Sequence, residues 1–330
     1  MKVIRTLLRD IQPDELGFTN AHEHIVCVPP YWQQRNQEDL LLDDPWKSQQ
    51  DVIDYRNAGG QSIIDATAID YGRRVQEVAN ISKETGVHII GTAGFNKSFL
   101  WDARIPTYLQ DLVGNYEIFT QWIDESSVET LVDFVSREIT EGLEGTSYKA
   151  GQVKFGTGYN AITPLEEKTL QVAVEVQKNL HVPMHSHTEA GTMGLEQIEL
   201  VKKYGGNLSS WSLGHMDRNL DPYIHEKIAK QGVYLSFDGL GKNKYGPESA
   251  RIDAIIGLIE KGFTSQILLG GDTARKSYYK HYKYGLGLGW IPSVWLDRFK
   301  EELEIRNLDA DEIIKLIFIE NPKRYLSMEV

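Results

Sequence analysis

The fold is decided by residues 17–26, which read GFTNAHEHIV and include His22 and His24. The apolar and β-branched residues of this segment predict a strand, and residues i and i+2 of a strand point to the same face. The two imidazoles are therefore expected side by side, as two metal ligands on one element would be. A His-x-His pair alone is weak support, because a strand histidine is more often a hydrogen-bonded core or surface residue.

Further short apolar runs along the chain alternate with segments of helical period. Seven of these runs are predicted strands, at 62–67, 87–93, 151–157, 180–187, 210–215, 232–238 and 266–271. The predicted helices are 73–84, 129–141, 165–178, 193–204, 222–230, 249–261, 293–304 and 310–320. Thr163, Pro164 and Glu166 form a capping-box pattern before the third of these helices. The last helix is predicted to end at Asn321-Pro322.

This alternation predicts an α/β fold, a (β/α)8 TIM barrel. No linker rich in Pro, Gly or Ser divides the chain, so residues 1–330 are interpreted as one domain. A doubly wound open sheet has the same alternation and is the alternative. Residues 94–128 are longer than an ordinary connection and are predicted to form an elaborated loop after strand three. The aromatic residues of this loop suggest a lid or the interface of a homodimer.

Composition limits the classes of partner. The 330 residues include 35 basic and 47 acidic side chains, a formal net charge of -12, and 41% of the residues are hydrophobic. This composition is that of a globular protein, and the negative charge argues against nucleic acid or an anionic membrane as the main partner. Cys27 is the single cysteine, and no apolar run is long enough to span a membrane. The sequence therefore predicts a cytoplasmic protein.

Three more metal-ligand side chains lie at the ends of predicted strands. His187 ends the fifth strand, His215 ends the sixth, and Asp272 follows the eighth. The carboxyl ends of barrel strands form one active face, so these residues should converge with His22 and His24. Joint placement, rather than any one histidine, predicts a metal site. The remaining histidines singled out as structural are His88, His181, His225 and His281.

Lys154 is unusual because it lies within the predicted fourth strand. A buried lysine is costly, and it ordinarily extends its amine to water or pairs with a carboxylate. Near a dication its pKa would fall, and the neutral amine could react with CO2 to give a carbamate. Such an anion could bridge two metal ions. The residues alone leave both interpretations open.

The motifs taken together resemble one family. They are Gly17–His24, Ile64-Asp65-Ala-Thr, Asp70-Tyr-Gly-Arg73, Val153-Lys154, His185-Ser-His187-Thr, Gly214-His215, Gly271-Asp272 and Asn321-Pro322-Lys-Arg-Tyr-Leu. In this order the chain resembles the phosphotriesterase-like lactonases of the amidohydrolase superfamily, over essentially its whole length. Within that family it looks similar to the subgroup active on phosphorylated sugar lactones.

The resemblance implies a binuclear centre of two divalent ions, zinc with manganese or cobalt as alternatives. His22, His24 and Asp272 would hold one ion, and His187 and His215 the other. Lys154, carboxylated by CO2 to N6-carboxylysine, and a hydroxide would bridge them. This chain has Asp238-Gly239 where paraoxon-hydrolysing relatives have a histidine after that aspartate. The departure weakens an organophosphate-hydrolase function and leaves Asp272 as the expected catalytic proton carrier.

Cations cluster in the loops after strands seven and eight, although the chain as a whole is acidic. Barrel loops at this position recurrently bind phosphate, and arginine and tyrosine suit that ligand. We therefore assign Lys244, Arg275 and Tyr278 to a substrate phosphate. The alternative is that these charges form a solvated surface. Three neighbouring residues receive no role from the sequence: Lys242, Tyr245 and Lys276.

The predicted function is opening of the ester ring of a small phosphorylated sugar lactone. A metal-bridging hydroxide would attack the carbonyl, and one ion would polarise the carbonyl oxygen. A phosphotriesterase or an N-acyl homoserine lactonase on the same centre is an alternative, but those neutral substrates favour an apolar mouth. A non-catalytic, zinc-stabilised ligand-binding barrel is another, although structural zinc usually has cysteine ligands. A retaining glycosidase would leave the histidines unexplained.

Overall fold

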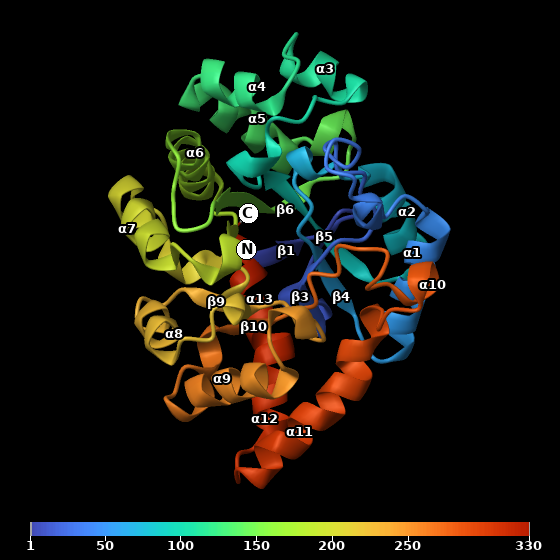
Figure 1. Cartoon of the computed structure of the whole chain (residues 1–330), viewed down its shortest axis with the longest axis vertical. Coiled ribbons are helices and arrows are strands. Elements are labelled where there is room, and N and C mark those ends of the chain that lie inside the picture. Colours follow the sequence, from blue (N-terminus) through green and yellow to red (C-terminus); the bar gives the residue numbers. More distant parts are fainter. Residues whose placement is uncertain (1, 330) are drawn as a thin grey trace.

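The computed structural model describes residues 2–329, and its centre is a sheet of eight parallel strands (Figure 1). The order of the strands around the barrel is their order in the sequence, so each strand after β3 forms hydrogen bonds with the barrel strand that precedes it in the chain. Their bounds are β3 Thr19–Glu23, β4 Ser62–Asp65, β5 His88–Gly94, β6 Ala150–Thr157, β7 Met184–Thr188, β8 Trp211–Leu213, β9 Tyr234–Phe237 and β10 Ile267–Leu269. Each strand coincides with a predicted run, and the (β/α)8 barrel prediction is confirmed.

Helices surround the strands, as Figure 1 shows. All eight predicted segments are helical, with these bounds: α2 Val75–Thr85, α5 Val128–Thr140, α6 Pro164–Leu180, α7 Gly194–Tyr204, α8 Pro222–Ala229, α9 Glu248–Glu260, α11 Leu296–Ile305 and α12 Ala310–Lys315. The capping box of α6 is confirmed, since Glu166 N donates to Thr163 Oγ1 at 3.2 Å and Thr163 N donates to Glu166 Oε2 at 2.9 Å. None of the helices within residues 2–329 is long and apolar enough to cross a membrane.

Helix α1, Pro45–Asn57, was not predicted from the sequence. Its buried face carries Ser48 and Asp51 beside Val52 and Tyr55, so no regular apolar stripe marks it. A small antiparallel sheet was also unpredicted, and it joins β1 Lys2–Arg5, β2 Asp10–Ile11 and β11 Met328–Glu329. The two ends of the chain therefore lie together, as Figure 1 shows. Strands of two to four residues are too short for a periodic signal.

The predicted end of the last helix at Asn321-Pro322 is wrong. A π-helical turn at Leu316–Glu320 leads directly into α13, Asn321–Leu326. Pro322 is the second residue of α13, so the proline lies within a continuous run of helical turns and does not end it. A similar π turn at Ile291–Trp295 leads into α11.

The elaborated loop after the third barrel strand is present, and it contains α3 Thr107–Val113 and α4 Phe119–Glu125. Trp101, Phe119 and Trp122 are at most 3% exposed, so these rings pack inside the chain. Tyr108 is exposed. A homodimer through this loop stays a prediction.

No ladder hydrogen bonds pair β3 with β10 within the described residues, so the barrel has a seam between its first and last strands. Asp272 N donates to His22 O at 2.8 Å across this seam. A Cβ at Gly270 would lie 2.7 Å from His22 N, so the close approach requires glycine. The seam brings the residues after β10 directly beside His22.

Candidate metal centre

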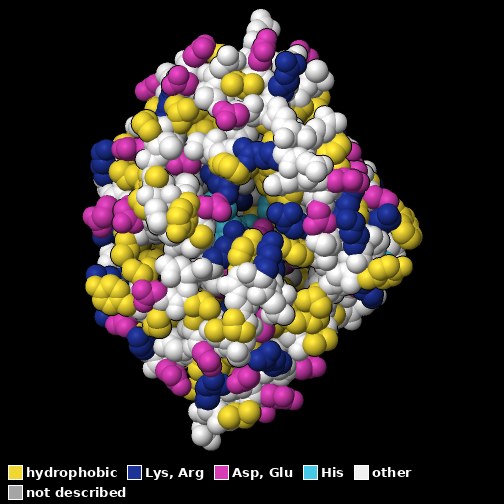
Figure 2. All heavy atoms as spheres, in the orientation of Figure 1, with side chains coloured by type: hydrophobic (Ala, Val, Ile, Leu, Met, Phe, Trp, Pro, Cys, Tyr) yellow, Lys and Arg dark blue, Asp and Glu magenta, His cyan; other side chains and the backbone are white. Residues whose placement is uncertain are grey.

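The six predicted metal-site side chains line one cavity at the carboxyl ends of the strands. His22, His187 and Lys154 lie on β3, β7 and β6, whereas the other three follow β3, β8 and β10. Figure 2 shows the opening as a hollow in which histidine lies at the bottom and Lys and Arg lie around the edge. The structure therefore brings together all of the side chains that the sequence assigns to the metal site.

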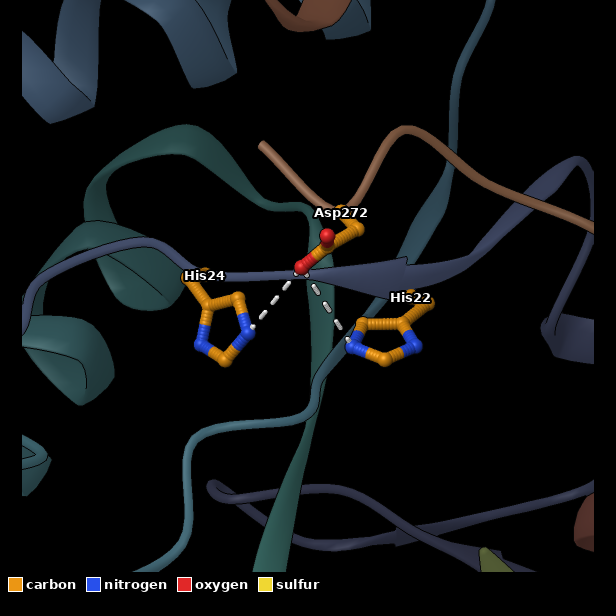
Figure 3. A group of neighbouring side chains, drawn as sticks. All are labelled: His22, His24 and Asp272. Carbon is orange, nitrogen blue, oxygen red and sulfur yellow. Dashed lines mark ion pairs between the residues drawn. The ribbon is translucent and has the colours of Figure 1, made fainter. Parts of the chain in front are cut away.

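Figure 3 shows two imidazoles facing one carboxylate. Asp272 Oδ1 lies 3.5 Å from His24 Nε2 and 3.7 Å from His22 Nε2. His24 Nδ1 is 2.8 Å from Thr67 Oγ1, which leaves Nε2 directed at the cluster. Both ring nitrogens of His22 are buried, Nδ1 has only the carboxylate of Asp238 near it, and Nε2 has no hydrogen-bond partner in the described part of the chain. Because buried polar atoms are normally satisfied, an orphaned imidazole beside a carboxylate fits a divalent metal ion.

A second group adjoins the first. His187 Nδ1 lies 2.8 Å from His215 Nε2, and His215 Nδ1 lies 2.6 Å from Asp238 Oδ1. Asp238 Oδ2 accepts a hydrogen bond from His215 N and lies 3.0 Å from His22 Nδ1. Asp238 thus connects the two groups and orients His215, a role that the sequence did not assign. His185, also unassigned, packs edge-on against His22 with ring centres 4.8 Å apart.

Burial keeps His24, His187 and His215 neutral, and the neutral imidazole is the form that binds metal. Burial lowers the pKa of His24 to about 4 and that of His215 to about 3. The pKa of His187 is also well below its ordinary value, chiefly through burial. Burial alone would raise the pKa of Asp272, but Lys242 and other neighbouring donors hold it well below the usual range. The site therefore presents three neutral imidazoles and the ionised carboxylate of Asp272.

Lys154 is 1% exposed, and its Nζ donates to Ala66 O at 2.8 Å. Within residues 2–329 Lys154 forms no ion pair, and its amine does not reach water. The two arrangements that ordinarily accommodate a lysine on a buried strand are therefore both absent there. Burial lowers its pKa to about 8. A larger fraction of this amine is therefore neutral near pH 7 than for an ordinary lysine, and the neutral amine is the form that reacts with CO2.

Two of the three residues assigned to phosphate line the cavity, and the third does not. Arg275 and Tyr278 line the cavity beside the metal cluster. Lys244 does not line it, and its side chain lies outside, with Nζ 5.2 Å from the ring centre of Tyr278. Of the unassigned neighbours, Tyr245 lines the cavity and Lys276 pairs with Asp43 at 3.1 Å.

Three cations that the sequence did not assign also line the cavity. Arg218 Nη2 and Lys242 Nζ each lie 2.7 Å from Asp272 Oδ2. Lys97 Nζ lies 3.1 Å from His187 Nε2 and pairs with Glu189. Lys97 and Arg218 follow their strands by three and five residues. Their position shortly after a strand is the sequence signal that could have pointed to them, but position alone does not show which loop side chains reach the cavity.

The barrel and this cluster define a TIM-barrel enzyme whose His and Asp side chains could bind a metal ion. The chain belongs to the Phosphotriesterase family, whose family model matches residues 2–326.

Similar proteins cover almost the whole chain. A phospho-furanose lactonase of Mycoplasmopsis synoviae is 31% identical, over 99% of this chain and 92% of that protein. The crystal structure of a lactonase from Listeria monocytogenes is 55% identical with a TM-score of 0.98, over 99% of this chain and 100% of that one. The phosphotriesterase homology protein of Escherichia coli, solved with phosphate in its active site, is 27% identical with a TM-score of 0.84, over 95% and 99%.

Proposed function

We propose that this protein is a metal-dependent lactonase that opens the ester ring of a small phosphorylated sugar lactone. The observation that carries the proposal is that Arg275 and Tyr278 line the same cavity as the His/Asp cluster. An anionic group held by these residues would therefore occupy the same cavity as the side chains assigned to the metal ions. The names of the Mycoplasmopsis and Listeria relatives support lactone hydrolysis.

The proposed cofactor is a pair of divalent ions, and zinc is the first choice. Manganese and cobalt are alternatives, because His and carboxylate ligands also accept these metals. His22, His24 and Asp272 would hold one ion, His187 and His215 the other, and carboxylated Lys154 would contact both. When bound, the ions supply Lewis-acid activation of water and of the lactone carbonyl.

The chain's own residues would provide proton transfer and orientation. Asp272 would accept the proton of the attacking water and pass it to the alkoxide that leaves when the ring opens. Arg218 and Lys242, both 2.7 Å from its carboxylate, keep Asp272 ionised before that transfer. Arg275 and Tyr278 would bind the phosphate, which orients the carbonyl toward the metal ligands.

The charge of the mouth argues against the alternatives. Besides Lys154, four Lys and Arg side chains line the cavity, namely Lys97, Arg218, Lys242 and Arg275. A neutral phosphotriester or N-acyl homoserine lactone gains nothing from this charge, whereas a phosphorylated substrate is attracted by it. Metal analysis distinguishes the proposed enzyme from a non-catalytic barrel. A metal content below about one ion per chain, together with no increase in the hydrolysis rate when zinc is added, would contradict a metal-dependent enzyme.

The decisive variant is Arg275→Ala, assayed on one sugar lactone with and without phosphate. A charged hydrogen bond contributes about 1.5–3 kcal/mol, so kcat/KM for the phosphorylated lactone should fall by roughly 10- to 150-fold. The unphosphorylated lactone should change little. Lys283→Ala is the matched control, because Lys283 and Arg275 both contact Asp39 but only Arg275 lines the cavity. Equal losses on the two substrates would contradict the phosphate assignment.

A further inference from the structure

Glu23 lies between His22 and His24 in the sequence, yet its side chain points to a different set of partners. The residue is fully buried, and it reaches across the barrel seam. Glu23 Oε1 accepts a hydrogen bond from Gly271 N at 2.8 Å, and Oε2 accepts one from Thr273 N at 2.9 Å. One carboxylate thus holds the backbone on both sides of Asp272.

The backbone that Glu23 holds is strained. Asp272 has a φ of 40°, in the left-handed region that residues with a Cβ rarely occupy. Such a conformation persists only where the surroundings impose it. Asp272 N donates to His22 O at 2.8 Å, and the two bonds to Glu23 flank this one. Asn20 Nδ2 donates to Glu23 Oε1 at 2.9 Å and so orients the carboxylate itself.

We infer that Glu23 is a positioning residue that fixes Asp272 so that its carboxylate meets His22 and His24. The inference rests on the proposed function only in taking these three side chains as metal ligands. Two backbone donors and one amide donor require a group that is an acceptor at both ends. A glutamine would direct its NH2 group at one of the backbone N–H groups, and the peptide carrying Asp272 would turn away.

The test is a titration of the metal-free full-length protein with Co2+, followed by visible absorption, for the wild type and Glu23→Gln. Loss of a partner that orients a metal ligand typically weakens binding about 10- to 100-fold. We expect a shift of that size in the Co2+ affinity, with a changed absorption spectrum, while circular dichroism stays that of the wild type. In lactone hydrolysis, kcat should fall and KM should change little.

Glu138→Gln is the matched control, because Glu138 is also a buried glutamate but pairs with Arg73, away from the metal ligands. Asn20→Ala is a milder second variant that keeps the carboxylate and should weaken Co2+ binding in the same direction. The inference would be overturned if Glu23→Gln and Asn20→Ala both bound Co2+ with an affinity within twofold of the wild type and gave the wild-type absorption spectrum. Because Co2+ binding is read without substrate, wild-type protein that binds Co2+ but opens no lactone contradicts only the proposed function.

Discussion

At the scale of single residues, Lys154 is the most informative side chain of the site. It is the only lysine among the proposed metal ligands, and burial lowers its pKa to about 8. Among residues 2–329 its Nζ has a single hydrogen-bond partner, the carbonyl of Ala66. A neutral amine can attack CO2: the N–C bond forms, a proton leaves to water, and the product carries a negative charge. The site would then contain an anion able to bridge two metal ions in place of a buried cation.

We expect wild-type protein loaded with zinc and labelled bicarbonate to show a carbamate signal in its carbon NMR spectrum. Lys154→Met should lack this signal and bind fewer than two ions per chain, because the bridging ligand is gone. Lys168→Met, at a half-buried site on α6 where the amine donates to Asp124 O, is the control and should retain both properties. A full metal complement in Lys154→Met would contradict the carbamate assignment.

At the scale of an element, the first turn of helix α6 makes two kinds of contact: it forms a capping box, and it binds the loop that carries Lys97. Glu166 closes the box with Thr163, and its Oε1 also accepts hydrogen bonds from Ser98 N at 3.1 Å and Ser98 Oγ at 2.7 Å. The start of α6 therefore anchors the segment that follows β5 beside the cavity.

Removal of the cap by Thr163→Ala should lower the free energy of unfolding by about 1 kcal/mol, since N-cap hydroxyls contribute about that much. Chemical denaturation followed by circular dichroism measures the change. Thr140→Ala removes an exposed hydroxyl that bonds only within α5, and it should change stability by less than about 0.5 kcal/mol. Equal effects of the two substitutions would contradict a specific role for the cap.

At the scale of the whole molecule, the proposed metal ligands come from both sides of the barrel seam. His22 and His24 belong to the first barrel strand and the residue after it, whereas Asp272 follows the last strand. Since β3 and β10 share no ladder within the described residues, a bound ion would add a direct connection between the ends of the sheet. Folding and metal binding should therefore be coupled.

We expect a chelator to lower the apparent melting temperature by several degrees. A ligand at about one hundred times its Kd stabilises the folded state by about 2.7 kcal/mol per site. Differential scanning calorimetry with and without added zinc measures the shift. The double variant His22→Ala/His24→Ala is the control and should respond less. A melting temperature that is independent of zinc and chelator in the wild type would contradict metal binding across the seam.

The amino-acid sequence by itself determined the barrel and the metal-site residues that converge in it. Strand and helix periods are local, and the topology of a barrel places every strand end on one face, so His187, His215 and Asp272 could be expected to meet. Helix α1 was missed because half of its buried face is polar.

Only the tertiary structure decided which side chains in the loops reach the cavity, because their directions depend on partners far away in the chain. The loop after β10 is held by Asp39, whose carboxylate accepts from Ser277 N at 3.0 Å and from Ser277 Oγ at 2.6 Å. This contact spans 238 positions, and no local pattern contains it. Lys244, assigned to phosphate from its position alone, lies outside, whereas Arg218 lines the cavity. Glu23 was likewise hidden, since its partners are backbone amides at the other end of the chain.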